Sequence, residues 1–257
     1  MDGRIIKGIV LALAGWAMAV WTAPGVRAAD PVRIRPSLQA EYFNRTITWD
    51  EEAYTSKLEA LLFSFSLEVE PLKGFSANVT LGYSPSNFNG LVFRQMPFSV
   101  DLEGGYLGGM LLGGGLKNKF VVSQDWEMDL EAQFVMSLGS KASWLITELA
   151  QSGTLSGNGT WYRIQAGPVF WYKGFMYFSP YLRISFDKLW GTFHMEEVIG
   201  PLNGLEDKAV KGSGLFSVAL GTFYEPTPAI GLRGEIYVLP RSKGVDYGAL
   251  GRLAFSF

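Results

Sequence analysis

The feature that most constrains this chain is a strict alternation of apolar and polar side chains, seen clearly in its final stretch, 245–257. Tyr247, Leu253 and Phe255 fall on one face of an extended chain there, and the opposite face is small, polar or charged. A period of two is typical of a β-strand with one apolar face. The stretch therefore predicts a strand that runs to the aromatic residue Phe257, rather than a frayed tail.

The same alternation recurs along the chain. In 126–138, for example, Met128, Leu130 and Phe134 share one face, opposite acidic and polar residues. Ten strands are predicted in this way: 32–42, 57–70, 75–83, 98–122, 126–138, 162–172, 176–186, 216–224, 230–238 and 245–257. The segment 98–122 is long for one strand and could bend at one of its glycine pairs or hide a turn, so barrels of eight or twelve strands are the alternatives.

Short and long connections alternate between these strands. Turns at 71–74, 123–125, 173–174 and 225–228 separate loops at 43–54, 84–95, 139–160, 188–211 and 240–244. No apolar run after Trp21 could cross a membrane as a helix, although 48% of the residues are hydrophobic. A membrane protein without spanning helices has to be a closed barrel, because lipid offers no partners to a sheet edge. The sequence thus predicts an all-β fold, a transmembrane antiparallel up-and-down β-barrel of about ten strands.

The alternating strands and the aromatic end at Phe257 together resemble the small outer-membrane β-barrel proteins of Gram-negative bacteria as a class, and no motif selects one family within it. The resemblance covers 29–257 and implies a location in the outer membrane, with its lipid and lipopolysaccharide as partners. It also implies that the barrel assembly machinery reads the closing strand at Phe257, and that the short turns and both termini face the periplasm.

The first residues predict a secretory signal peptide. Arg4 and Lys7 give a positive start, 9–21 is uncharged and apolar, and 26–28 forms a small-x-Ala cleavage pattern. The apolar part is too short for a spanning helix, which needs about 20 residues. We therefore expect two parts, a signal peptide at 1–28 and an outer-membrane barrel domain at 29–257.

Composition argues against several function classes. A formal net charge of −2 argues against a nucleic-acid partner, and the absence of cysteine removes disulfides and thiolate metal sites. The single histidine, His194, has Thr192 two residues before it and Glu196 two residues after it. The Asp-x-His and His-x-Ser elements of known outer-membrane barrel enzymes are therefore missing. We expect no enzyme activity, no cofactor and no metal site.

Charged residues on the polar faces of the strands are the candidate functional residues. The predicted lumen-lining set is Arg33, Arg35, Glu68, Glu70, Asp101, Glu103, Glu127, Asp129, Glu131, Arg163, Arg183, Arg233, Glu235 and Arg252. Because the tenth strand closes against the first, the basic residues are expected along one wall and most acidic residues along the facing wall. Two interpretations stay open: a filled interior held by ion pairs, or a narrow aqueous lumen with a transverse field.

Aromatic residues and loops give further expectations. Trp126 and Trp171 are predicted in an interfacial girdle at the turn end, and Trp49, Trp161 and Trp190 as membrane anchors at the loop end. The loop 139–160 is expected to contain a short helix at 143–150.

Three hypotheses for function follow. The first is a structural barrel or a narrow pore for small solutes, with a charged interior. The alternative is a surface-binding barrel whose long loops, 139–160 and 188–211, contact a partner or lipopolysaccharide. The third is a soluble periplasmic barrel of lipocalin type. Which solute or partner is involved, and the oligomeric state, are not encoded in any motif of the chain.

Overall fold

The computed structural model describes residues 32–49, 55–89, 91–93, 100–102, 105–146, 153–199 and 202–256. Residues Arg33–Phe257 form one compact unit. The predicted signal peptide and Phe257 lie outside the described residues, so the expectations placed on them stay predictions. Within the described ranges, no helix is long and apolar enough to cross a membrane.

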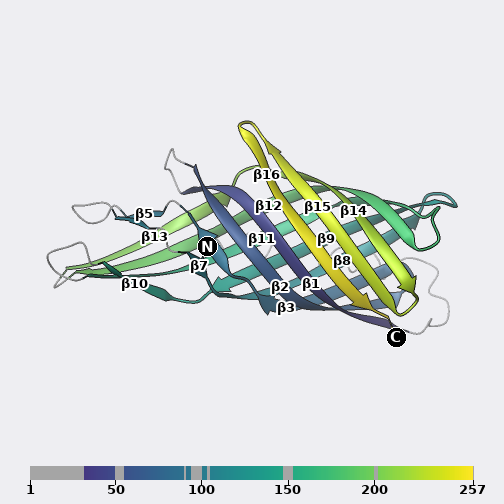
Figure 1. The fold of residues 1–257 in the computed structure, drawn as a ribbon, viewed down its shortest axis with the longest axis horizontal. Coiled ribbons are helices and arrows are strands. Elements are labelled where there is room, and N and C mark those ends of the chain that lie inside the picture. The colour runs from purple at the N-terminus through teal and green to yellow at the C-terminus, as the bar shows by residue number, and fades with distance from the viewer. Residues whose placement is uncertain are drawn as a thin grey trace. The chain divides into compact units, whose positions relative to one another are not determined.

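Ten long strands form a closed antiparallel ring (Figure 1). They are β1 (Arg33–Trp49), β2 (Thr55–Leu72), β3 (Phe75–Tyr83), β8 (Gly109–Val121), β9 (Trp126–Gly139), β11 (Gly153–Tyr172), β12 (Phe178–Ile199), β14 (Phe216–Thr227), β15 (Ile230–Arg241) and β16 (Gly244–Phe255). Each pairs with the next, and β16 returns to β1, with Ala40 opposite Gly251. The predicted fold, a transmembrane antiparallel up-and-down barrel of ten strands, is confirmed.

Side chains alternate across the wall of the barrel as the sequence predicts. Leu220 and Ile236 point outward and are each 68% exposed, whereas Ala219 and Tyr237 point inward and are buried. The outward face of the ring is thus apolar over a band that lipid can cover. Prolines 36, 168 and 180 lie within β1, β11 and β12, respectively. Each removes one N–H donor from the hydrogen bonds between strands, and the strand continues past it.

One predicted strand is interrupted, and several predicted loops are strands instead. The segment 98–122 is broken into β6 (Val100–Leu102), β7 (Tyr106–Leu107) and β8, with Gly105 at a positive φ of 66° between the first two. Residues of the predicted loop 84–95 form β4 (Ser86–Phe88) and β5 (Leu91–Phe93). The helix expected at 143–150 is wrong as far as the chain is described, because β10 (Ala142–Ile146) pairs there with β11. The loop 188–211 is a hairpin of β12 with β13 (Leu202–Gly212).

The barrel narrows toward the end that carries the long connections, here called the loop end. There β13 pairs with β12 on one side and with β1 on the other, through Ile47–Trp49 opposite Val210–Gly212. One strand, β13, thus takes the place of β14, β15 and β16, so a ring of ten strands becomes a ring of eight. We call this change the taper. Beyond it, β10–β13 continue as a projecting sheet, the extension, while the β15–β16 hairpin leaves the wall (Figure 1).

Candidate functional site

The taper creates an apolar filling in the outer half of the lumen. A ring of eight strands encloses a space that side chains alone can fill. The residues that fill it, here called the apolar plug, are Phe43, Ile47, Trp49, Leu58, Phe88, Leu155, Trp161, Phe193 and Met195, all buried. Their rings interlock: the Phe88 and Phe193 centroids are 5.1 Å apart, and Phe43 meets Trp161 edge-on at 5.4 Å.

The indole N–H groups within the plug are hydrogen-bonded to protein side chains. The indole nitrogen of Trp49 donates to the Ser56 hydroxyl at 2.7 Å, and that of Trp161 donates to the Ser86 hydroxyl at 2.9 Å. Gly159 lies where a β-carbon would stand 2.5 Å from the Phe88 ring, so only glycine lets the ring pack against this strand. The outer lumen therefore has the packing of a protein core.

Below the plug, toward the short turns, the lumen is filled by charged and polar side chains. Arg163 lies where this polar layer meets the plug, and its guanidinium is 5.1 Å from the centre of the Phe43 ring. It donates to Glu41 at 2.6 Å and to Gln165 at 3.2 Å. The Tyr237 hydroxyl donates to the same Glu41 oxygen at 2.7 Å. These groups are all buried, so each charge is satisfied by a neighbour rather than by water.

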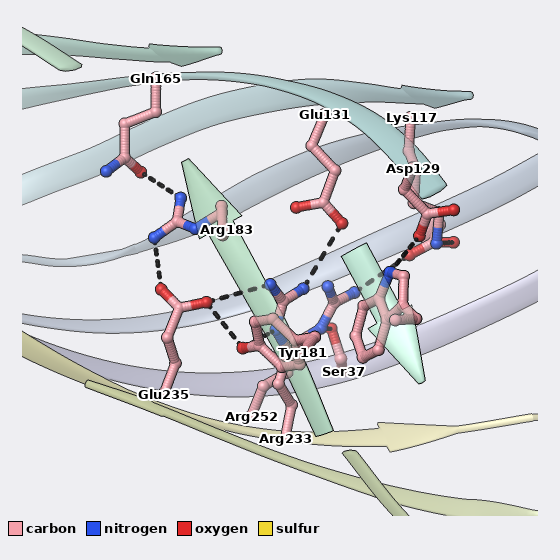
Figure 2. A network of polar contacts seen from close by, with 12 residues as sticks. Ser37, Lys117, Asp129, Glu131, Gln165, Tyr181, Arg183, Arg233, Glu235 and Arg252 are labelled. Atoms are coloured by element: carbon pink, nitrogen blue, oxygen red, sulfur yellow. Dashed lines mark hydrogen bonds and ion pairs between the residues drawn. The ribbon is translucent and has the colours of Figure 1, made fainter. Parts of the chain in front are cut away.

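A second cluster centres on Glu235 (Figure 2). Arg183 forms a buried ion pair with this carboxylate, and Tyr181 donates to it at 2.6 Å. Arg233 donates to Glu235 at 3.1 Å and to the Tyr181 hydroxyl at 2.7 Å. Its third partner is Glu131, at 3.6 Å from across the lumen. Arg183 and Arg233 thus share one carboxylate, and Tyr181 helps to hold it in place.

A third cluster centres on Glu68. Its oxygens lie 3.3 Å from Arg252 and 3.1 Å from Lys117. Arg252 also donates to the Ser37 hydroxyl at 2.9 Å. Arg35 completes the group at 3.9 Å from Glu68 and pairs with Glu70 at 3.7 Å. Side chains from β1, β2, β8 and β16 meet here, so this cluster links the closing strand to the first ones.

The remaining predicted lining residues lie near the turn end. Glu127 pairs with Lys119 at 2.7 Å, and Asp129 accepts from the Trp171 indole at 2.9 Å. Arg33 lies opposite Glu70 in the β1–β2 ladder and is exposed. The backbone of Asp101 belongs to β6, its side chain lies outside the described part, and so does Glu103.

The expected separation into a basic and an acidic wall is wrong. Arg233 and Glu235 come from the same strand, and Glu68 on β2 lies among three cations. The physical reason is that a buried charge needs a partner of opposite sign within hydrogen-bonding distance, so signs have to interleave.

Three tryptophans also depart from expectation. Trp49 and Trp161 were predicted as membrane anchors, yet they are fully buried in the plug. Trp171 was predicted in the girdle, yet its ring points inward against Tyr181, with centroids 4.3 Å apart. Trp126 and Trp190 do lie on the outward face, where Trp190 stacks on Tyr162 at 5.7 Å.

The predicted lining set leaves out Glu41, Asp187 and Tyr237, although the alternation turns them inward, and it also leaves out Arg45, which falls in a predicted loop. The plug itself was not predicted. The signal was present in β1: its inward positions change from Ser37 and Glu41 to Phe43 and Ile47 along one face. That change of character on one unbroken face indicates two layers of lumen.

His194 lies outside the lumen. It contacts Asp207 on the neighbouring strand at 2.5 Å, on the exposed face of the extension. In the described part of the chain, no group of three or more histidine or acidic residues is placed to hold a metal ion. The expectation of no enzyme activity stays a prediction.

Comparison with known proteins adds little. No family model and no curated protein matches the chain. Among solved structures it is similar to the outer-membrane protease OmpT of Escherichia coli, at 11% identity over 91% of this chain and 100% of that chain, with a TM-score of 0.45. It is also similar to the translocator domain of the autotransporter NalP of Neisseria meningitidis, at 11% identity over 100% and 98% of the two chains, with a TM-score of 0.37. A third similar structure is the toluene transporter TodX of P. putida, at 10% identity over 87% of this chain and 67% of that chain, with a TM-score of 0.40. At these scores the fold assignment rests on the strand pairing of the chain itself.

Proposed function

We propose that this protein is an integral outer-membrane barrel with a closed lumen, and that it acts by binding a partner outside the cell through its extension. The observation that supports the proposal is the apolar plug, whose buried side chains pack against one another inside the ring of eight strands, as far as the chain is described. The paired charges below the plug support the same conclusion, because an aqueous pore would leave them solvated rather than buried.

The extension supports the second half of the proposal. Leu145, Val198 and Leu205 come from β10, β12 and β13 and share its outward face, with Leu145 76% exposed. Val198 lies eight residues beyond Trp190 along β12, and this distance along the strand supports a position of the face in water above the lipid. Three large apolar side chains exposed on one face support the use of that face for binding.

Recordings in planar bilayers test the closed lumen. The purified protein should show no steady single-channel conductance. A variant that empties the plug, W49A with W161A and F193A, should conduct, because the polar layer then connects to bulk water. Steady conductance of the unaltered protein would exclude the proposal and support the narrow pore instead.

Photo-crosslinking in living cells tests the binding surface. A photoreactive side chain at position 145 or 205 should give the same crosslinked product, because both positions lie on one face. The control position is 73, in the turn between β2 and β3 at the opposite end of the barrel. A product that forms equally at position 73, or none at 145 and 205, would argue against the extension as a binding surface.

A further inference from the structure

Where the β15–β16 hairpin leaves the wall, the taper opens a cleft on the outer surface of the barrel. Its volume is about 700 Å³, and it lies between the hairpin tip and the residues that link β13 to β14. We call it the seam cleft. Its lining includes Thr46, Lys57, Leu215, Phe216, Arg241 and Lys243.

The seam cleft is rich in positive charge. Lys57, Arg241 and Lys243 reach it from two separate hairpins, and the side chain of Lys57 is 39% exposed. Among the described residues of the cleft, one carboxylate opposes them: Asp246 is fully buried and lies 3.0 Å from Lys57 and 3.1 Å from Arg241. Three cations against one carboxylate give this described lining a net positive charge, which favours an anionic ligand.

The carboxylate of Asp246 is also hydrogen-bonded to Thr46. It accepts hydrogen bonds from the amide and the hydroxyl of Thr46, both at 2.8 Å, at the point where β1 exchanges β16 for β13. The carboxylate thus caps a strand amide that has lost its ladder partner. Lys57 and Lys243 keep donors for a ligand, because ammonium groups offer three each.

The level of the cleft identifies the source of the anion. Tyr42 and Tyr247 form an outward-facing aromatic pair, with centroids 6.2 Å apart, directly below it. Trp190 lies on the outward face beside β13, opposite Lys211. Tyrosine and tryptophan on the outer face mark the boundary between hydrocarbon and headgroups. The cleft therefore lies at headgroup level, on the side of the long connections.

The cleft also has an apolar wall that continues toward lipid. Leu215 and Phe216 line it, and Phe216 is 63% exposed on the outward face of β14. A ligand that combines a phosphate with an acyl chain would satisfy both parts, with charge against the lysines and hydrocarbon along Phe216. A free anion would use only the first.

We infer that the seam cleft binds the phosphate group of a glycolipid of the outer leaflet, with Lys57, Arg241 and Lys243 as ligands of the phosphate and Phe216 beside an acyl chain. This inference rests on the outer-membrane placement proposed above and not on the closed lumen or on the extension. Its failure would leave the conductance and crosslinking results unchanged.

Native mass spectrometry of the detergent-solubilised barrel tests the inference. Diphosphoryl lipid A should bind about tenfold more tightly than the same lipid with its phosphates removed, and about tenfold more tightly than inorganic phosphate. The double variant K57Q/K243Q should lose about tenfold in affinity for diphosphoryl lipid A, because two charged donors are removed. The control variant K73Q/K141Q removes the same charge elsewhere and should bind as the unaltered protein does.

Three results would overturn the inference: equal binding of the dephosphorylated lipid, an equal loss in the control variant, or inorganic phosphate binding as tightly as the lipid. The last would indicate a site for a free anion. If K57Q/K243Q does not fold, K243Q alone remains a test, because Lys243 is exposed at the hairpin tip. It should lose about threefold in affinity, and no loss would count against the inference.

Discussion

Arg45 holds the two sides of the taper together. Its guanidinium forms a buried ion pair with Asp187, at the point where β12 exchanges β14 for β13. It also donates to the carbonyls of Ser213 and Gly214 at 3.3 and 3.2 Å, in the link from β13 to β14. Gly214 turns that link at a positive φ of 80°, which a side chain would strain. One side chain of β1 thus supports both strand exchanges.

Replacing Arg45 with methionine should lower the free energy of unfolding by about 3–5 kcal/mol, because Asp187 is then buried without its cation. R45M with D187N should cost less than the sum of the two single changes, since both report one interaction. Urea titration of the folded barrel in lipid vesicles measures all three. Additive losses would show that the two residues act separately.

Glu197 gives a prediction about pH. It is fully buried on the inward face of the extension, and neither carboxylate oxygen has a hydrogen-bond partner in the described ranges. Burial raises its pKa above the ordinary value of 4.5. A raised pKa means that the folded form prefers the proton, so the extension should lose stability as pH rises from 4.5 through the raised pKa.

Hydrogen exchange of β12 and β13 measures this loss. Protection in the extension should decrease as pH rises through that window, after correction for the intrinsic rate, and E197Q should remove the decrease. The turn-end part of β12, residues 178–186, serves as an internal reference. A decrease that persists in E197Q would assign it to another group.

At the scale of single strands, the outward faces of the barrel and of the extension look alike but lie in different solvents. Leu220 on β14 and Leu205 on β13 are 68% and 60% exposed. L220R should impair assembly and cost about 2–4 kcal/mol, because hydrocarbon cannot solvate the guanidinium. L205R is the matched control and should assemble normally. Heat-modifiability of the barrel on gels measures both, and equal effects would place both positions in the same solvent.

The sequence predicts strands well where one face meets lipid and the other meets the lumen, because those solvents impose a period of two. All ten strands of the ring and their facing follow from this rule, as in 126–138 and β9. The rule weakens above the membrane, because the outward face of a strand meets water there and carries polar residues such as His194. There β10 was mistaken for part of a helix, and the β12–β13 hairpin for a loop.

The candidate site was predictable in part. The alternation of side chains along each strand predicts which charges face the lumen. Their partners depend on the stagger between strands around the barrel, which local sequence does not encode. Arg252 illustrates this limit. The alternation along its strand predicts that it faces inward, but its partner Glu68 lies 184 residues away in the sequence, on β2. The plug required knowing that β13 replaces three strands, and that pairing joins Trp49 to Val210.

At the scale of the whole molecule, the taper gives the barrel two closures. The ring of ten closes through β1 and β16, and the ring of eight closes through β1 and β13. Cysteines at 48 and 211 test the second closure, and cysteines at 40 and 251 test the first, because both pairs are directly opposite in the ladders and the chain has no native cysteine. The 48–211 disulfide should form even in a variant whose 40–251 disulfide is lost through L220R. Joint loss of both crosslinks would show that the closures are one event.

Two closures also divide the work of the chain between two lengths of it. The ring of eight uses only strands up to Gly212, whereas the ring of ten also needs β14, β15 and β16. All the residues of the apolar plug belong to the first length. Damage confined to the last three strands should therefore open the wall near the short turns and leave the seal at the loop end in place.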